Sequence, residues 1–431
     1  MNKIYYLLAL LVVLVSCESK TEIPDSLYYN EETGTFDIRS VGDLLYLGQV
    51  VETGVIKREG SEQTFQVDGA KLRLVNDLVI EDEWVPLGEK KGYKLKEIDG
   101  NGHSITFKNV SYEMDMWSSS DFGLFGYLMG TTVKDLTLKG NIHLISNEEK
   151  APFGGTIGVL AAFFWGGCLE NCNSEVNISV TAVGEKASMD VEVGGLVGKI
   201  SVDDITSPVK ERTVLKGVVS HTGDISIESN GRIDVGGIAG SARDVKWQEG
   251  ISLINQGSIK ITGESGGESK GHTIGGVFGE YLQYKVRSLG APQRIMNLKN
   301  SADITVSCAK DDLLKVAGVV GKIFNENNML ADNFCNEGTI TVKGNPEMSG
   351  SISGVIGEAE ENISLHRMVN KGKIKIDGKF SSLTVCGIAY SPSIMCTGIL
   401  YSCCEDLASG YPPVHDSFIP WLRRDCKMKH D

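Results

Sequence analysis

The chain has few aromatic side chains and lacks both a membrane-spanning run and a basic surface. Phe, Trp and Tyr make up 7% of its 431 residues. The apolar run from Ile4 to Val15 is too short to cross a bilayer as a mature helix, and no later segment reaches that length. The net charge of -14 argues against nucleic acid as a partner.

Signatures of catalysis are also missing. The seven His residues are scattered and form no His-Glu-x-x-His zinc motif, so we predict no metal site and no cofactor. Lys199 and Lys322 follow glycines but lack the rest of a phosphate-binding loop, which makes them solvated lysines at strand ends. The segment 263–267 looks like the nucleophile segment of trypsin-like proteases, yet no His has a matching context. The sequence therefore predicts no enzyme.

The amino-terminal residues are typical of an exported protein. Lys3 precedes the apolar run, as in a secretory signal. Leu14-Val15-Ser16-Cys17 resembles the lipobox of bacterial lipoproteins, which implies that residues 1–16 are removed and that Cys17 receives lipid. Several acyl chains would hold the protein stably on a membrane. We expect a surface-exposed protein anchored to the bacterial outer membrane, with residues 17–35 as lipidated cysteine and polar tether.

Glycine is abundant, at 51 residues, and its main pattern is a repeat. Two apolar residues bracketed by glycines, here called the glycine-bracketed motif, recur along the chain at spacings of 33 to 42 residues, if degenerate copies at Gly158 and Gly387 are included. Variable spacing around a fixed motif predicts constant strands joined by loops of different length. The full copies begin and end at Gly123 and Gly126, Gly195 and Gly198, Gly237 and Gly240, Gly276 and Gly279, Gly318 and Gly321, and Gly354 and Gly357.

A second element, Asn-x-Gly-x-Ile, begins at Asn255, Asn336 and Asn370. We expect its Asn and Gly to supply the left-handed backbone of a bend. The residues that follow alternate between aliphatic and polar, which is the period of a half-buried strand. The aliphatic pairs are Ile142/Leu144, Ile178/Val180, Ile225/Ile227, Ile259/Ile261, Ile304/Val306, Ile340/Val342 and Ile374/Ile376, and the polar residues between them are His143, Ser179, Ser226, Lys260, Thr305, Thr341 and Lys375.

Stacking such repeats about 4.8 Å apart would bury the aliphatic pairs as a ladder and leave the polar residues as a solvated face. Helical repeats would need amphipathic stretches with little glycine, and propeller blades would need four strands where we place two or three per period. The sequence predicts an all-β, right-handed parallel β-helix, a solenoid. An amphipathic helix over Ser40–Glu52 is expected to cap its first coil, because an open sheet edge attracts other strands.

The repeats resemble those of the GLUG-motif proteins, named for glycine, leucine, an apolar residue and glycine, over roughly residues 36–390. The resemblance implies an N-terminal cap and first coils at 36–122, a GLUG-repeat β-helix at 123–390 and a Cys-containing C-terminal cap or tail at 391–431. One or two disulfides could staple the end of the chain, with partners left open among Cys386, Cys396, Cys403, Cys404 and Cys426.

Two further expectations concern the interior. Cys172 and Cys335 occupy the position before the bend that Ile254 and Val369 occupy in other repeats. Since those residues are apolar, we predict that both cysteines are small core residues. The glycine-bracketed motif is apolar on both sides, which implies a strand buried on both faces. Long loops or the segment 418–421 would cover its outer side, or else it is a docking strip for a partner.

Asp99, Asn101 and His103 are the one weak candidate site. Two glycines alternate with them, and this pattern favours a tight corner over an active site. Pectin-cleaving β-helix enzymes carry clustered acids with Arg or Lys along one face, and no such cluster emerges from the sequence. The favoured function is a non-enzymatic surface scaffold that binds a host or envelope protein or a glycan. A polysaccharide lyase or hydrolase, acting near Asp99, Asp77 and His103, and a structural spacer are the alternatives.

Overall fold

The computed structural model describes residues 21–81, 83–88, 92–114, 120–146, 154–182, 190–201, 212–263, 271–284, 293–307, 313–326, 328–344, 346, 348–360, 363–390, 395–396 and 400–402. The predicted signal 1–16, Cys17, Cys403, Cys404, Cys426 and the segment 418–421 lie outside these residues. The regular secondary structure of the described residues is almost entirely β-strand, with one helix, α2 (Val41–Val50). None of the helical structure described is long and apolar enough to cross a membrane.

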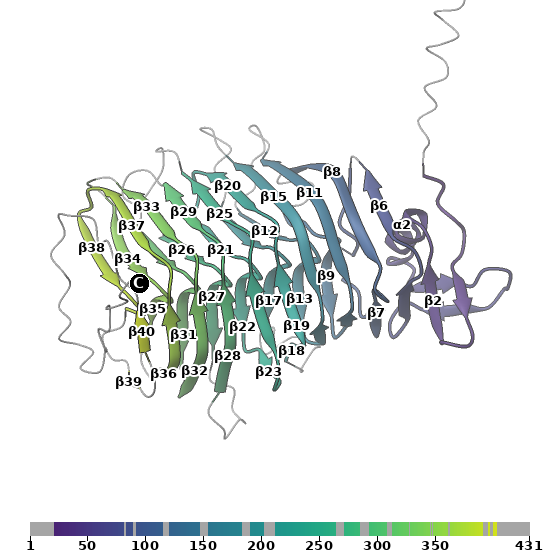
Figure 1. The fold of residues 1–431 in the computed structure, drawn as a ribbon. Helices are drawn as coiled ribbons and strands as arrows, with labels where there is room; N and C mark the ends of the chain where they lie inside the picture. The colour runs from purple at the N-terminus through teal and green to yellow at the C-terminus, as the bar shows by residue number, and fades with distance from the viewer. Residues whose placement is uncertain are drawn as a thin grey trace, which may run out of the picture.

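The strands stack as a parallel β-helix, seen from the side in Figure 1. Each central coil passes through four sheets, here numbered 1 to 4 in chain order, and every strand pairs in parallel with its equivalents in the neighbouring coils. The predicted all-β parallel β-helix is confirmed. The expected two or three strands per period are wrong, because corners divide each central period into four or five short strands, such as β16 to β20.

The strands of the four sheets are as follows. Sheet 1 contains β12 (Gly154–Gly158), β16 (Asp190–Gly194), β21 (Ile233–Gly236), β26 (Gly271–Gly275), β30 (Leu313–Ala317), β34 (Ser349–Ser353) and β38 (Ser382–Cys386). Sheet 2 contains β9 (Phe125–Met129), β13 (Ala161–Trp165), β17 (Val197–Ser201), β22 (Ala239–Arg243), β27 (Phe278–Gln283), β31 (Val320–Asn325) and β35 (Ile356–Ala359). Sheet 3 contains β1 (Tyr28–Asn30), β2 (Thr35–Ile38), β5 (Lys71–Leu74), β7 (Glu97–Asp99), β10 (Thr132–Lys134), β14 (Cys168–Glu170), β18 (Val214–Lys216) and β23 (Lys246–Trp247).

Sheet 4 is the longest and bends in the middle of each coil. It contains β6 (Leu78–Glu81), β8 (Ser104–Met114), β11 (Thr137–Ser146), β15 (Asn173–Ala182), β19 (Val218–His221), β20 (Ile225–Ser229), β24 (Ser252–Asn255), β25 (Ile259–Thr262), β28 (Gln293–Asn300), β29 (Ile304–Ser307), β32 (Met329–Asn336), β33 (Ile340–Gly344), β36 (Ile363–Asn370), β37 (Ile374–Gly378), β39 (Met395–Cys396) and β40 (Leu400–Ser402). A separate antiparallel hairpin joins β3 (Val55–Lys57) and β4 (Thr64–Gln66) near the amino-terminal end.

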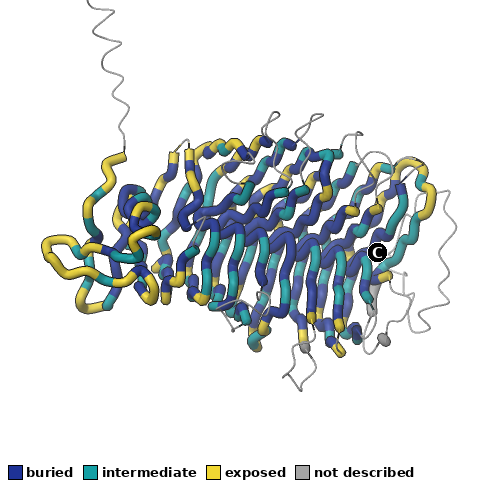
Figure 2. The backbone as a smooth tube through the Cα atoms, turned by 180° about the vertical axis from the view of Figure 1, so that it is seen from behind, coloured by how far each residue is buried: buried dark blue, intermediate teal, exposed yellow. Residues whose placement is uncertain are grey.

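The aliphatic ladder predicted after the bend lies in the second half of sheet 4. Ile225 pairs with Ile259, and the column continues through Ile304 and Ile340 to Ile374, all buried. The polar residues between the aliphatic pairs are exposed or half-buried. Buried positions therefore alternate with exposed or half-buried ones along these strands. Figure 2 shows the same mixture of buried and less buried residues along the coils of the stack. The register inferred from the repeats is confirmed.

The predicted capping helix is α2, which packs against β2, β3 and β6 at the amino-terminal end of the stack (Figure 1). It begins with a capping box, in which the Asp43 backbone N–H donates to Ser40 Oγ at 3.3 Å and the Ser40 N–H donates to Asp43 Oδ2 at 2.9 Å. Leu44, Tyr46 and Leu47 are buried on its inner side. The helix thus covers the apolar interior of the first coil.

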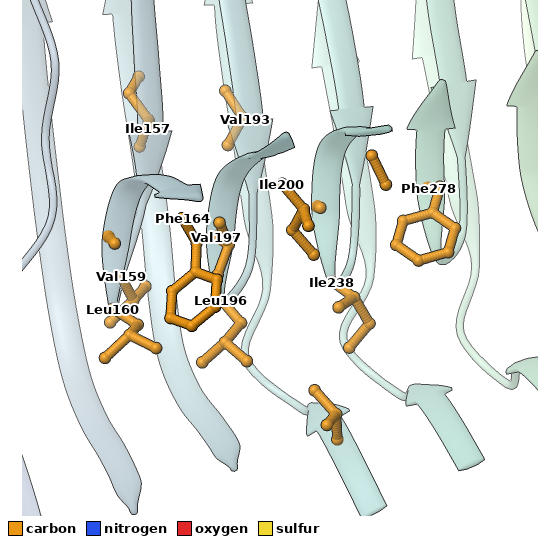
Figure 3. Close-up of a cluster of buried hydrophobic side chains, with 14 of the residues drawn as sticks. Ile157, Val159, Leu160, Phe164, Val193, Leu196, Val197, Ile200, Ile238 and Phe278 are labelled. Atoms are coloured by element: carbon orange, nitrogen blue, oxygen red, sulfur yellow. The ribbon is translucent and has the colours of Figure 1, made fainter. Parts of the chain in front are cut away.

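The glycine-bracketed motif is a corner between two sheets. In the copy that starts at Gly195, β16 ends at Gly194 and β17 begins at Val197. Because the chain turns between them, Val193, Leu196 and Val197 all reach the interior, where they share one buried cluster (Figure 3). A strand buried on both faces was therefore the wrong interpretation, and neither a covering loop nor a docking strip is needed to explain its apolar residues.

The corners meet the bends of sheet 4 in the middle of the molecule, at what we call the waist. Asn255, Asn300, Asn336 and Asn370 are fully buried there and form an amide ladder, in which the Nδ2 of each of the first three donates to the Oδ1 of the next Asn at 2.8 to 3.0 Å. A Cβ added to Gly237 would lie 2.3 Å from Asn255 Cγ, and the first glycines at 276, 318 and 354 face the other rungs equally closely. The first glycine of each of these motifs therefore makes room for the ladder.

Two details of the bends differ from expectation. The glycines of Asn-x-Gly-x-Ile do not have a left-handed backbone. Gly257 is needed because an added Cβ would lie 1.7 Å from the carbonyl oxygen of Gly223 in the preceding coil. The degenerate copy of the glycine-bracketed motif near Gly158 also begins one residue later than predicted. Ala161 pairs with Val197 of the next coil, so the residue equivalent to Gly195 is Val159 and not Gly158.

The two interior cysteines do not share a register. The pairing Asn173↔Ser220↔Ile254↔Lys299↔Cys335↔Val369 places Cys335 on the outer, half-buried side of sheet 4. Cys172 precedes Asn173 and is buried. The prediction of a core position is therefore right for Cys172 and wrong for Cys335. Both carry free thiols.

Candidate functional site

The corner between sheets 1 and 2 folds inward, so that the outer faces of these sheets approach each other along a seam of buried and half-buried side chains, here called the valley. The last glycine of each motif lies at its floor. A Cβ added to Gly240 would lie 2.8 Å from the backbone nitrogen of Val193 and 2.9 Å from Cγ of Glu192, both on the sheet 1 strand of the preceding coil. Glycine is thus required for the two walls to approach each other.

Two columns of side chains point outward along the walls of the valley. Each column is one residue per coil, stacked by the parallel register. The sheet 1 wall carries Thr156, Glu192, Asp234, Thr273, Lys315 and Ser351, and the sheet 2 wall carries Tyr127, Phe163, Lys199, Ser241, Glu280, Lys322 and Glu358.

Ion pairs bridge the walls of the valley. Lys199 Nζ lies 3.3 Å from Glu192 Oε2, and Lys315 Nζ lies 3.0 Å from Glu358 Oε1. Burial raises the pKa of Glu192, and the neighbouring Lys199 opposes that shift. Partly buried pairs of this kind hold the walls together, because removing one partner would leave the other charge desolvated.

One carboxylate pair breaks this pattern of opposite charges. Asp234 on sheet 1 and Glu280 on sheet 2 repel each other across the valley. The pKa of Glu280 is raised mainly by burial of its carboxyl and further by this repulsion. Burial also raises the pKa of Asp234, although Arg232 lies 2.6 Å from its Oδ2. The other oxygen, Oδ1, is buried and has no hydrogen-bond partner among the described residues. Both carboxyls are therefore protonated more easily than an ordinary Asp or Glu.

The amino-terminal end of the valley is aromatic. The ring of Tyr127 stacks on that of Phe163, with centroids 4.6 Å apart and planes 3° from parallel, and Trp165 meets Phe163 edge-on at 5.8 Å. All three are half-buried, so part of each ring meets solvent. The solvated ladder on sheet 4 lacks aromatics, but this second face supplies an amphipathic surface on which a sugar ring can stack.

The sequence contained a signal for the valley that was missed. The residues of the valley lie at fixed positions relative to the glycine-bracketed motif. Those on sheet 1 lie three residues before the first glycine, as Asp234 does, and those on sheet 2 lie one residue after the last glycine, as Glu280 does. Treating the motif as one continuous strand concealed that these two positions face each other. For the same reason Lys199 and Lys322 are not solvated strand-end lysines but half-buried ion-pair partners, Lys322 of Glu360 at 3.2 Å.

The weak candidate site does not converge. Asp99 lies 3.2 Å from Lys134 and accepts the N–H of Asn101, which has a left-handed backbone. Asn101 Nδ2 donates to the carbonyl of Leu74, whereas His103 faces Asp77 at 3.5 Å. The Ser104 backbone N–H lowers the pKa of Asp77. Each of these groups contacts a different partner, either within the turn or on a neighbouring coil. The three side chains therefore do not converge on one point at which a substrate could bind.

A shallow pocket of about 370 Å³ lies on the outer side of the bend in sheet 4. Its floor is a ladder of exposed amides, in which Asn177 Nδ2 donates to Asn141 Oδ1 at 2.9 Å and Asn177 Oδ1 accepts the N–H of Asp224 at 2.9 Å. His143 and Ser226 of the solvated face line it. No group of three or more His, Cys, Asp or Glu that could hold a metal occurs in the described part of the chain.

Comparison with known proteins adds little to this geometry. No protein-family model matches the chain, and no curated protein matches it. Among solved structures, the chain is similar to the crystal structure of a "putative immunoglobulin A1 protease from Bacteroides ovatus". The identity is 13%, the alignment covers 83% of this chain and 86% of that chain, and the TM-score is 0.33.

Proposed function

We propose that this protein is a lipid-anchored surface scaffold of the GLUG-motif type that binds a glycan along the valley. The anchor and the family rest on the lipobox around Cys17 and on the repeated motif. Glycan binding rests on one observation, namely that the half-exposed rings of Tyr127, Phe163 and Trp165 lead directly into a row of charged side chains. Stacking and hydrogen bonding are the two contacts that hold a sugar.

A second candidate, a polysaccharide hydrolase, is favoured by the Asp234 and Glu280 pair. A carboxyl with a raised pKa can donate a proton to a glycosidic oxygen, while a nearby carboxylate activates water or attacks the sugar. Arg232, which pairs with Asp234, and Lys322, which pairs with Glu360, lie beside the two carboxyls. Both candidates use the valley and differ only in whether a bond is cleaved.

Glycan binding can be tested with the full chain in detergent on an array of polysaccharides. We expect specific binding that falls about five- to twelvefold in Trp165→Ala, because removal of a stacking ring costs about 1–1.5 kcal/mol. Tyr28→Ala removes a ring exposed outside the valley and serves as control. No binding to any polysaccharide by the wild type would leave the spacer as the better description.

Cleavage is tested by measuring reducing and unsaturated ends released from whichever polysaccharide binds. Activity that is lost in Glu280→Gln and in Asp234→Asn, but kept in the exposed control Glu175→Gln, would establish the enzyme. Binding without release of ends supports the scaffold. The anchor is tested separately, since Cys17→Ser should move the protein from the membrane fraction to the soluble fraction, and protease treatment of intact cells reports surface exposure.

A further inference from the structure

An apolar surface lies beside the helix that caps the amino-terminal end of the stack. It surrounds a shallow pocket of about 350 Å³ between α2 and the segment 85–88. Val85 is 64% exposed, more than any other large apolar side chain of the described residues, and Ile23 is 38% exposed. The apolar side chains that line the pocket form what we call the apolar patch: Ile23, Leu45, Val51, Val85, Pro86 and Leu87.

The segment that carries Val85 is held in place on both sides. Trp84 is buried, and its Nε1–H donates to the carbonyl of Leu124 at 3.3 Å. On the other side of Val85, a Cβ added to Gly48 of α2 would lie 3.1 Å from Leu87 Cδ2, so the helix and this segment are in direct contact. Val85 is therefore fixed in an exposed position, where its contact with water is unfavourable unless something covers it.

The chain enters the fold directly beside the apolar patch. Residues 22–24 run along α2, since a Cβ added to Gly42 would lie 2.4 Å from the Glu22 carbonyl oxygen and 3.3 Å from Pro24 Cδ. Ile23, between them, belongs to the patch, and only five residues separate it from Cys17. A fully extended chain of that length spans about 20 Å. A lipid on Cys17 would therefore keep the patch within about 20 Å of the membrane surface.

We propose that the apolar patch docks on a neutral lipid surface. This docking rests on the proposed lipid anchor at Cys17. An anchor this close raises the local concentration of the patch at the bilayer, so that a few apolar side chains that would bind too weakly alone can insert. Glu22 precedes Ile23, Glu52 lines the pocket, and both acids are exposed. Anionic headgroups would repel these acids, which favours zwitterionic lipid.

Docking through the apolar patch would orient the whole stack. α2 lies at one end of the β-helix, and β37 and β38 lie at the other (Figure 1). Leu87 of the patch forms a bridge with Phe125 at the start of β9, the strand that also carries Tyr127. The aromatic end of the valley would thus lie nearest the membrane. The later coils would extend outward from it, each about 4.8 Å farther than the one before.

The test measures contact between the apolar patch and lipid in the full, lipidated chain. The protein is reconstituted in phosphatidylcholine vesicles whose acyl chains carry bromine, which quenches tryptophan on contact. In Val85→Trp we expect about half of the added emission to be quenched, because a docked side chain is buried about 5–10 Å into the headgroup boundary. Leu313→Trp, at a 44% exposed position on β30 far along the stack, should not be quenched. Ile23→Asp, added to Val85→Trp, should remove most of the quenching because it places a charge in the patch.

Mass spectrometry of the same samples reports whether Cys17 carries lipid. Lipid on Cys17 without quenching in Val85→Trp would overturn the docking and leave the anchor intact, whereas a chain without lipid would refute the anchor and the docking together. Equal quenching in Val85→Trp and Leu313→Trp would also overturn the proposal. So would a dimer in detergent that Val85→Asp abolishes, because the patch would then bind a second copy of the chain. Quenching that strengthens when phosphatidylglycerol is added would contradict docking on a neutral surface.

Discussion

His221 stands at the waist where the next coils have Asn, and its replacement by Asn should stabilise the protein. Its ring is fully buried against Gly195, and neither ring nitrogen has a hydrogen-bond partner in the part of the chain that the structure describes. In the next coil, Asn255 Nδ2 donates to the Gly257 carbonyl at 2.9 Å and to Asn300 Oδ1 at 2.8 Å. The amide in His221→Asn would gain the equivalent bonds. An unsatisfied buried group costs about 1–3 kcal/mol, so we expect a gain of that size at pH 7.5.

The same substitution should alter the dependence of stability on pH. Burial lowers the pKa of His221 from 6.5 to about 4. Between these values the unfolded chain binds a proton that the folded chain does not, so wild-type stability is lost as pH falls through this window. Each pKa unit is worth about 1.4 kcal/mol, which makes the loss about 3 kcal/mol at pH 4.

Urea unfolding followed by tryptophan fluorescence at pH 7.5 and pH 4 measures both effects. The advantage of His221→Asn over the wild type should grow by about 3 kcal/mol at the lower pH. His143→Asn, which changes an exposed histidine, should show no such growth. An advantage that is the same at both pH values would refute the reasoning, because the buried imidazole would then titrate normally in the folded state.

Three other substitutions test the waist and the cap by the same unfolding measurement. Gly276→Ala should lower the free energy of unfolding by about 3 kcal/mol or more, because the added Cβ would lie 2.1 Å from the Gly318 carbonyl oxygen. Gly271→Ala is the control, since nothing lies within 4 Å of its added Cβ, and it should change the free energy of unfolding by less than about 1 kcal/mol. Asn300→Ala should lower the free energy of unfolding by about 2–4 kcal/mol, because Asn255 and Asn336 would each lose a hydrogen-bond partner. A smaller loss than in Asn333→Ala, which removes an exposed amide, would contradict a stabilising role of the amide ladder. Ser40→Ala should cost about 1 kcal/mol through the lost helix cap, and equal stability would mean that α2 does not depend on it.

The stacking of coils and their register could be predicted from the sequence. Ile225, Ile259 and Ile304 recur after the same bend with polar residues between them, and a strand has only two faces, so the pattern identifies the buried one. The capping helix was equally accessible, since its apolar spacing and Ser40 are local signals. These features depend on residues close together in the chain.

The repeats are enough to predict a stack of parallel coils with one aliphatic interior. Three contacts become visible only once the chain is folded: Asp234 faces Glu280, Gly237 contacts Asn255, and Arg294 and Arg367 converge on Asp332. Periodicity reports on which side of a strand a residue lies, whereas these contacts depend on the direction in which each corner turns, and that direction is set by close approach between coils about 40 residues apart.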